Sequence, residues 1–240
     1  AWKAFSELDW PTRRHEEWSR TDIRLFKLDK FALPSIEAEV GEAVPPRLSE
    51  GVTLAGSSVS LDSRPVSCRL TDRWAEKGVL FGSLEVLLRE HGDLLRPHLE
   101  RRVVDPHHDK FAALHAACRT GGHLLYVPRG VVLDEPVHAL SALSDGGVDF
   151  SHTLVIMEEN SEASFLTESA SLNESDGGLH CGATELLLAP EAKLRFVNLQ
   201  DWGQGVWHFA HQKAVVDRDA SLQWTIAALG CRLSKVNQHV

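Results

Sequence analysis

The chain contains few cysteines and no long apolar segment. Its four cysteines, Cys68, Cys118, Cys181 and Cys231, lie far apart among 240 residues and form no C-x-x-C pair. A disulfide framework or a structural zinc cage is therefore not expected. No apolar run approaches the roughly 18 residues that a membrane-spanning helix needs, and the charged N-terminus lacks the apolar centre of a secretory signal. These absences favour a cytoplasmic protein that does not enter a membrane.

Concentrated positive charge and the common catalytic motifs are also missing. The formal net charge is −9 and the lysines and arginines are scattered, which argues against nucleic acid as a partner. No G-x-x-x-x-G-K-S/T motif is present, so any dependence on ATP must come from a partner. There is no G-x-S-x-G motif either, and no Ser/His/Asp arrangement stands out. We therefore expect a protein that is not itself an enzyme.

What is present divides the chain into two parts. Residues 1–120 predict a mostly helical N-terminal region, with most of the helix at 1–30 and, in two segments, at 71–99. Three prolines in residues 31–50 predict a linker or an extended wrap. Residues 121–240 read as strands separated by turns, and they predict a β-helix domain.

Local signals refine the N-terminal region. The stretch GVTLAGSSVSL (51–61) is strand-like, and Ser83 is placed to cap a helix. Asp109 is placed to start a further short helix. We interpret His107 and His108, which precede it, as solvated neighbours of this N-cap.

Four segments from His123 onward resemble one another. Each has an apolar strand, a polar turn with an acid followed by a small residue or proline, and a second strand. The acids recur at nearly equal intervals, at Glu135, Glu162, Glu191 and Asp219. A period of about 28 positions predicts a parallel β-helix, because one coil cannot bury its own apolar face and must stack on its neighbours. A β-sandwich with similar hairpins is the alternative, which the equal spacing disfavours.

Several segments resemble the SufB/SufD family of iron–sulfur cluster assembly proteins. They are PTRRHEEWSRTD (11–22), FAALHAACRTGGHLLYVPRGVVLDEPV (111–137), HTLVIMEENSEASF (152–165) and the run from LQDW to DRDASL (199–222). The resemblance implies a right-handed parallel β-helix core between N-terminal and C-terminal helices. It also implies a complex with the ABC-type ATPase SufC, in which SufB and SufD pair through their β-helices. Such a complex handles iron, nascent iron–sulfur clusters and reduced FAD.

The resemblance also bears on which branch of the family this chain follows. Gln200 and Trp202 match a Q-x-W element of SufB-type proteins, which implies a lining for sulfur or cluster passage. A cysteine that SufB-type proteins carry falls near Ala170 and is absent here. The basic and Asn residues of SufB fall near Ser141 and Leu143, so they are not matched either. The chain is therefore more SufD-like, a partner in iron delivery that pairs with a SufB-type paralogue, or with itself when isolated.

The two ends of the sequence suggest a piece of a longer protein. The chain lacks a starting Met, and LGCRLSKVNQHV begins a further coil and stops inside it. We expect the family's C-terminal metal and sulfur residues, and the helices that contact SufC, to lie beyond Val240. On that expectation, residues 1–240 alone neither bind SufC nor hold a cluster.

Histidines recur at the coil period. His152, His180 and His208 are equally spaced at this interval, and in register they would form a ladder on one face. An extra residue in one coil would instead align His152 with Cys181. Either arrangement predicts soft ligands for a metal or a nascent cluster, with His152, His180, Cys181 and His208 as candidates. A stack of surface or core histidines without metal is the competing interpretation.

The H-x-x-H pair His208 and His211 suggests a metal site only on a helix. HFAHQKAVV reads as a strand, in which residues three apart point to opposite faces, so these two should not share a metal. Gln200 and Trp202 are two apart and share a face, where packing is the alternative to a role in passage.

Three function classes remain. An assembly component of the iron–sulfur family fits the resemblance. A β-helix polysaccharide lyase or hydrolase needs clustered carboxylates on one face and usually a secretory signal. A left-handed β-helix acyltransferase needs a hexapeptide repeat, whereas the period here is about 28 positions. The first is the predicted function, and the carbohydrate-active enzyme is the alternative.

Overall fold

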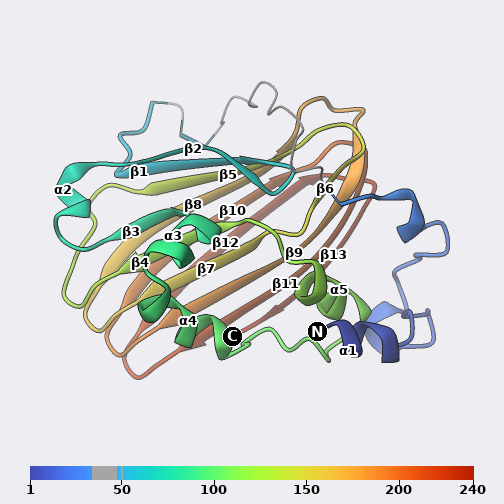
Figure 1. Ribbon diagram of the computed structural model, residues 1–240, viewed down its shortest axis with the longest axis horizontal. Helices are drawn as coiled ribbons and strands as arrows, with labels where there is room; N and C mark the ends of the chain where they lie inside the picture. The colour runs from blue at the N-terminus through green and yellow to red at the C-terminus, as the bar shows by residue number, and fades with distance from the viewer. Residues whose placement is uncertain (34–47, 50) are drawn as a thin grey trace.

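The computed structural model describes residues 1–33, 48, 49 and 51–240, and it forms a β-solenoid of about four turns (Figure 1). Two sheets face each other across the interior. Sheet A contains, in spatial order, β12 (Ser221–Gly230), β10 (Lys193–Asp201), β8 (Glu162–Ser171), β5 (Val137–Leu143), β1 (Gly56–Leu61) and β2 (Arg64–Leu70). Sheet B contains β13 (Leu233–His239), β11 (Gly205–Val216), β9 (Gly177–Leu188), β7 (His152–Met157), β4 (His123–Val127) and β3 (Leu80–Ser83), and β6 (Gly147–Asp149) pairs with β9.

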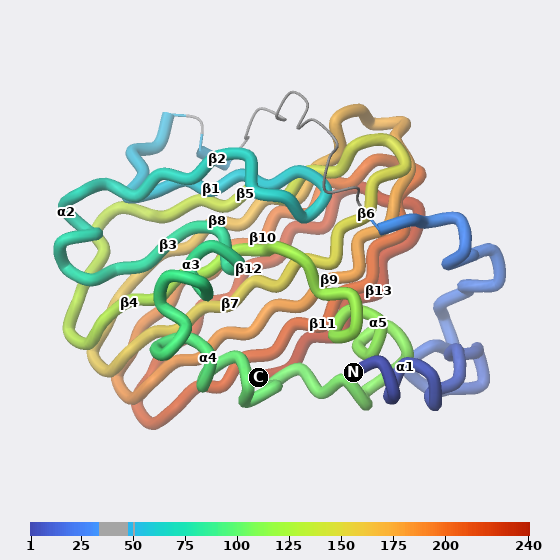
Figure 2. Tube along the Cα trace, viewed as in Figure 1, coloured from blue at the N-terminus to red at the C-terminus, as the bar shows by residue number. Residues whose placement is uncertain are grey.

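Strands of successive coils pair in parallel, which confirms the predicted solenoid. β10 lies between β8 and β12, and β9 between β7 and β11, all in parallel register. A β-sandwich built from hairpins would pair consecutive strands in antiparallel fashion, and only the edge pairs β1–β2 and β3–β4 do so in the described part of the chain. Figure 2 shows the coils running side by side, with the colour passing from one edge of the molecule to the other.

The predicted corners are partly wrong. Glu191 and Asp219 do turn the chain with positive φ, but the matching residue of the preceding coil is Asn160. The backbone N–H of Asn160 donates to the carbonyl of Pro190, one coil later. Glu162 lies two residues further on, inside β8, opposite Lys193. An asparagine fits this corner because Asn tolerates the left-handed region better than most residues.

The described helices all precede β4 in the chain. Of residues 1–30, expected to be helical, the helix α1 covers only Trp2–Glu7, followed by the 3-10 turns η1 (Glu16–Trp18) and η2 (Leu28–Lys30). Most of the predicted linker 31–50 lies outside the described residues. None of the described helices combines the length and apolarity needed to cross a membrane.

Residues 71–99 differ from the prediction of two helical segments. They form α2 (Asp72–Ala75), the strand β3, α3 (Leu84–Glu90) and the start of α4 (Gly92–Glu100), so the predicted break is a strand of sheet B. Ser83 precedes α3, but its hydroxyl makes no cap hydrogen bond.

The helix α5 (Lys110–Cys118) is predicted correctly. Asp109 caps it, since its carboxylate accepts hydrogen bonds from the N–H groups of Phe111 and Ala112. Replacing such a cap with Ala typically costs about 1 kcal/mol.

Apolar packing holds α3, α4, α5 and the N-terminal segment to the outside of sheet B. Trp18, Phe26 and Phe111 pack on Phe209 of β11, with the Phe111 and Phe209 rings stacked at 3.7 Å. A second cluster joins α3 and α4 to the same sheet. Aromatic packing, rather than helical periodicity, therefore fixes residues 1–30.

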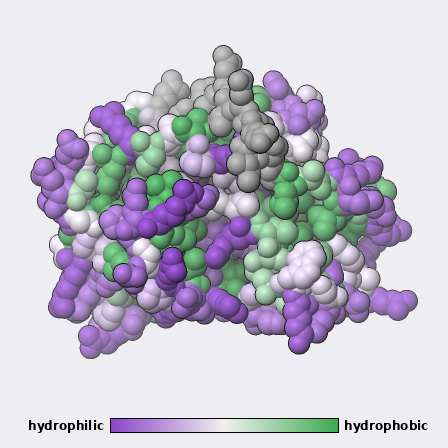
Figure 3. Space-filling view, viewed as in Figure 1, coloured by the Kyte–Doolittle hydropathy of each residue, from purple (hydrophilic) through white to green (hydrophobic). Residues whose placement is uncertain are grey.

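The face drawn in Figure 3 mixes apolar and hydrophilic side chains, with hydrophilic residues along much of its rim.

The solenoid interior has two halves of different character. One is an apolar stack of inward side chains, with Phe165, Phe196 and Trp224 in register on three successive coils. The other is polar, and we call it the polar interior. It contains His123, Ser141, Ser151, Thr167, Asp149, His180, Gln200, His208 and Gln212.

Candidate functional site in the polar interior

His180 and His208 lie side by side in the polar interior. They are direct register partners on β9 and β11, and their rings stack at 4.8 Å with an interplanar angle of 23°. Their neighbours Cys181 and Phe209 point the other way, because side chains alternate along a strand. The spacing of these two histidines in the sequence therefore corresponds to two adjacent rungs.

His152 does not form the third rung. It pairs with Ala183, so it aligns neither with His180 nor with Cys181. Its side chain lies on the outer face, where its ring stacks on His115 at 5.4 Å and its Nε2 lies 3.8 Å from Glu185. The place expected for His152 is taken by Asp149, which the short strand β6 sets opposite His180.

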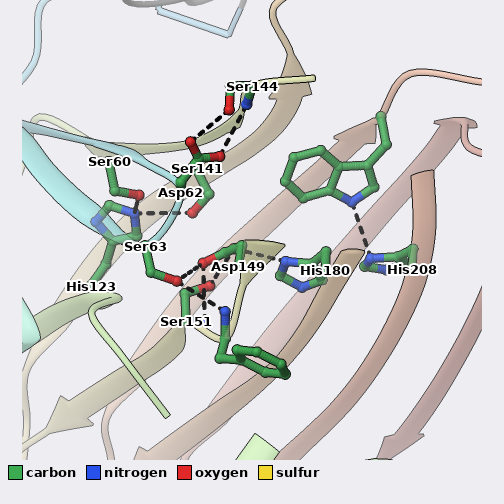
Figure 4. A network of polar contacts seen from close by, with 12 residues as sticks. Ser60, Asp62, Ser63, His123, Ser141, Ser144, Asp149, Ser151, His180 and His208 are labelled. Carbon is green, nitrogen blue, oxygen red and sulfur yellow. Dashed lines mark hydrogen bonds and ion pairs between the residues drawn. The ribbon is translucent and has the colours of Figure 1, made fainter. Parts of the chain in front are cut away.

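Asp149 is the centre of a buried hydrogen-bond network (Figure 4). Its carboxylate accepts from His180 Nδ1 at 2.8 Å, from the hydroxyls of Ser63 and Ser151, and from the backbone N–H of Ser151. Burial alone would raise the pKa of Asp149, but these hydrogen bonds outweigh it and leave the pKa lowered. Asp149 is therefore an ionised carboxylate, and its hydrogen bond with His180 fixes the orientation of that imidazole.

The carboxylate determines which nitrogen of His180 is available. Nδ1 donates its proton to Asp149, so a neutral His180 has its lone pair on Nε2. That nitrogen lies against Gly182, where an added Cβ would come within 2.6 Å of it. A carboxylate that orients an imidazole in this way is the usual arrangement behind a metal-binding histidine.

Trp202 fixes the second imidazole. Its indole N–H donates to His208 Nδ1 at 3.0 Å, so the proton of a neutral His208 is on Nε2. Burial lowers the pKa of His208 well below the ordinary value, and the nearby His180 adds to the effect. The Trp202 ring also contacts His180, with ring centroids 5.1 Å apart and an interplanar angle of 33°. The Q-x-W spacing predicted that Trp202 lies on the same strand as Gln200, but Trp202 lies just past the end of β10.

Gln200 lies at the end of β10 and lines the same space. Its amide donates to the carbonyl of Gly230. A cavity of about 40 Å³ runs between Gln200, His180, His208 and their polar neighbours, which is room for a water molecule or a small ion rather than a cofactor. No cysteine is among the described residues that line it.

Sequence reasoning missed His123 and Asp149. His123 is buried, with Nδ1 3.0 Å from the hydroxyl of Ser58 and Nε2 3.2 Å from that of Ser141. Burial lowers the pKa of His123 to about 4. Asp149 and His180 are separated by more than one coil period in the sequence, so a search at that period does not pair them.

Cys181 lies apart from this cluster. It points towards α5, where its thiol donates to the carbonyl of Phe111 at 3.4 Å. Burial raises the pKa of Cys181 well above the ordinary thiol value, so the reactive thiolate is disfavoured. All four cysteines of the chain are free.

The outer face beside His152 holds a separate, larger cavity. It has a volume of about 440 Å³, and Arg102, Arg119, His115 and Glu185 line it together with His152. Burial lowers the pKa of His115 to about 3, so this imidazole is neutral at physiological pH. The sequence-predicted candidates thus separate, with His180 and His208 inside and His152 and Cys181 outside.

The fold and this interior define a parallel β-solenoid protein with a buried, imidazole-rich polar half. Residues 140–240 match the family model of the SUF system FeS cluster assembly SufBD core domain, and residues 66–139 match that of the SufBD protein N-terminal region. The two matches are contiguous and cover well over half of the chain. The chain therefore belongs to the SufBD family of iron–sulfur cluster assembly proteins, as its resemblance predicted.

Curated relatives agree with this assignment. The chain is 29% identical over 182 residues to an iron–sulfur cluster assembly SufBD family protein of Staphylococcus epidermidis, which covers 75% of this chain and 39% of that protein. It is 26% identical over 227 residues to the iron–sulfur cluster assembly protein SufB of Bacillus subtilis, covering 93% of this chain and 46% of that protein. The chain spans less than half the length of these relatives.

Proposed function

We propose that this chain acts as a SufD-like, non-enzymatic component of an iron–sulfur cluster assembly complex. Its partners there are a SufB-type paralogue and a SufC-type ABC ATPase, in the cytoplasm. Membership of the SufBD family supports the process, and the missing phosphate-binding motif supports an external source of ATP hydrolysis. The handling of iron, clusters and reduced FAD belongs to the complex, with no cofactor held tightly by this chain.

The SufD-like assignment rests on the residues at three positions that the resemblance singles out. Ala170, near the place of a SufB cysteine, is buried on the outer face of β8, and Leu143 is fully buried in an apolar contact with Trp202. Ser141 points to His123 instead of offering a basic side chain. This interior favours imidazole and hydroxyl chemistry, which suits iron better than persulfide sulfur.

The observation that carries the proposal is the Asp149–His180 pair with His208 stacked on it. Asp149 keeps the Nε2 lone pair of His180 facing the polar interior, where it can bind Fe²⁺ that passes through. Hydroxyl and amide groups from Ser, Thr, Asn and Gln side chains also line this space and can replace part of the water that iron sheds.

The proposal is tested at two levels. Co-purification of the native protein with a SufC-type ATPase from the source organism tests membership of the complex, whereas clear glycan turnover by the isolated protein would support the carbohydrate-active alternative. Iron retained by the reconstituted complex tests the site. The double variant His180→Gln/His208→Gln should lose iron, while His152→Gln, a buried histidine on the outer face, should not. Equal iron content in both variants would contradict the role of the polar interior.

A further inference from the structure

A second group of ligand-type side chains lies on the opposite face of β11. His211 points outward from this strand, towards His108 and Asp109 at the start of α5. One ligand atom from each of the three residues lies within 4.8 Å of the other two. The ring centroids of His108 and His211 are 5.4 Å apart, and His211 Nε2 lies 3.1 Å from Asp109 Oδ1. The cluster joins two segments that are far apart in the sequence.

Two buried polar atoms of this cluster have no hydrogen-bond partner among the residues that the structure describes. Asp109 uses Oδ1 to cap α5, whereas its Oδ2 is buried and unpartnered. The Nδ1 atom of His211 is buried and unpartnered as well. Both side chains are at least nine-tenths buried, at 10% and 7% exposure. Buried polar atoms without partners are rare and costly, so they call for a ligand that the protein atoms do not supply.

We propose that His108, Asp109 and His211 form a binding site for one divalent transition-metal ion of the Zn²⁺ or Fe²⁺ class. Two imidazoles and one carboxylate are the ligand set that such ions take in proteins, with further positions left for water or another side chain. A hard cation such as Mg²⁺ would instead favour a set made of oxygen atoms.

The surroundings supply candidates for the remaining positions. The ring of His239, on β13, lies 6.0 Å from that of His108, and Glu17 Oε2 lies 3.5 Å from His108 Nε2. The amide of Asn237 lies 3.1 Å from His211 Nε2 and can orient the imidazole. The amino group of Lys235 is engaged with the backbone carbonyl of Glu17.

This site is separate from the polar interior. His208 and His211 lie on the same strand, but they face opposite sides of sheet B, and only His208 contacts Trp202. A metal at the outer site would join the N-terminus of α5 to β11. Binding should therefore stabilise the packing of α5 on sheet B, because a ligand that binds only the folded state raises its stability.

Zn²⁺ titration of the purified protein by calorimetry tests the proposal, with Co²⁺ absorption as a spectroscopic probe of ligand number. Asp109→Asn is the informative variant, because Asn remains a good N-cap while the carboxylate is lost. His108→Ala removes a partly exposed ligand. His107→Ala is the matched control, since His107 is the adjacent histidine and contacts only Asp105 among the described hydrogen bonds.

We expect the wild-type protein to bind one Zn²⁺ at this site with a rise in melting temperature. Asp109→Asn and His108→Ala should each weaken binding by about tenfold or more, and His107→Ala by less than about twofold. The variant His180→Gln/His208→Gln should bind as the wild type does, which separates this result from the test of the polar interior. A folded Asp109→Asn protein that binds Zn²⁺ as tightly as the wild type would overturn the proposal, as would a wild type that binds none.

Discussion

Acidification should destabilise this protein well above the pH at which carboxylates are protonated. Burial lowers the pKa of His115 to about 3 and that of His123 to about 4, and it also lowers the pKa values of His152 and His208. Each of these groups is neutral in the folded state but takes up a proton near pH 6.5 when the chain unfolds. Stability is therefore complete above pH 6.5 and is lost progressively as the pH falls towards the folded-state pKa values.

The size of the effect follows from proton linkage. One proton of difference is worth about 1.4 kcal/mol per pH unit, so each such histidine removes about 2 kcal/mol between pH 6.5 and pH 5. His115 and His123 together remove about 4 kcal/mol, and His152 and His208 act in the same direction. Burial raises the pKa of Glu185, which opposes the trend by no more than one proton. A loss of this size is a large share of the roughly 5–15 kcal/mol typical of a folded domain.

Urea unfolding at several pH values between about 7.5 and 5 measures this dependence. The fitted slope of the unfolding free energy against pH gives the number of protons taken up on unfolding. His123→Asn should lower that number by about one, because Asn can still contact the serine hydroxyls around it without titrating. An unfolding free energy that is the same at pH 5 and pH 7.5 within about 1 kcal/mol would refute the reasoning, since it would mean that these imidazoles reach solvent in the folded state.

Three further outcomes are expected. Gly182→Ala places a Cβ within 2.6 Å of His180 Nε2, so it should displace this ring and cost about 1–3 kcal/mol in urea unfolding; an unchanged His180 signal in NMR would contradict it. Asp149→Asn removes the charged acceptor of His180 and should lower the free energy of unfolding by about 3–5 kcal/mol; an unchanged free energy of unfolding would argue against a buried charge at Asp149. Native alkylation followed by mass spectrometry should modify the exposed Cys68 and leave the buried Cys181 unmodified until urea is added; rapid native labelling of Cys181 would show that α5 opens.

The sequence predicts the solenoid and one pair of rungs for a clear physical reason. β9 and β11 are long and uninterrupted, so one coil period places His180 on His208. The prediction fails for the preceding coil because that coil is longer, and His152 therefore pairs with Ala183 instead of His180. The additional length lies in the loop between β8 and β9, where the chain advances from Ala170 to Gly177.

Loops tolerate such insertions because they run outside the stacked strands. The equivalent step one coil later is shorter and runs only from Asp201 to Gly205. The regular spacing of Glu162 and Glu191 is therefore a coincidence. This coil is longer than the next one, but Glu162 lies two residues after the true corner at Asn160, and the two differences nearly cancel. The role of Asp149 could not be predicted from the sequence for the same reason. Its contact with His180 depends on where an insertion lies, which the residue types alone do not tell.

The parity of residues along β11 keeps two kinds of chemistry apart. His208 and His211 are three positions apart, so one imidazole must face the interior and the other must face α5. Inside, His208 is held neutral by burial and by the indole of Trp202, and it lines a small cavity with room for one small species. Outside, His211 meets a carboxylate and an imidazole from another part of the chain. A motif that resembles one metal site in the sequence therefore contributes to two different environments, because a strand, unlike a helix, divides such a pair between its faces.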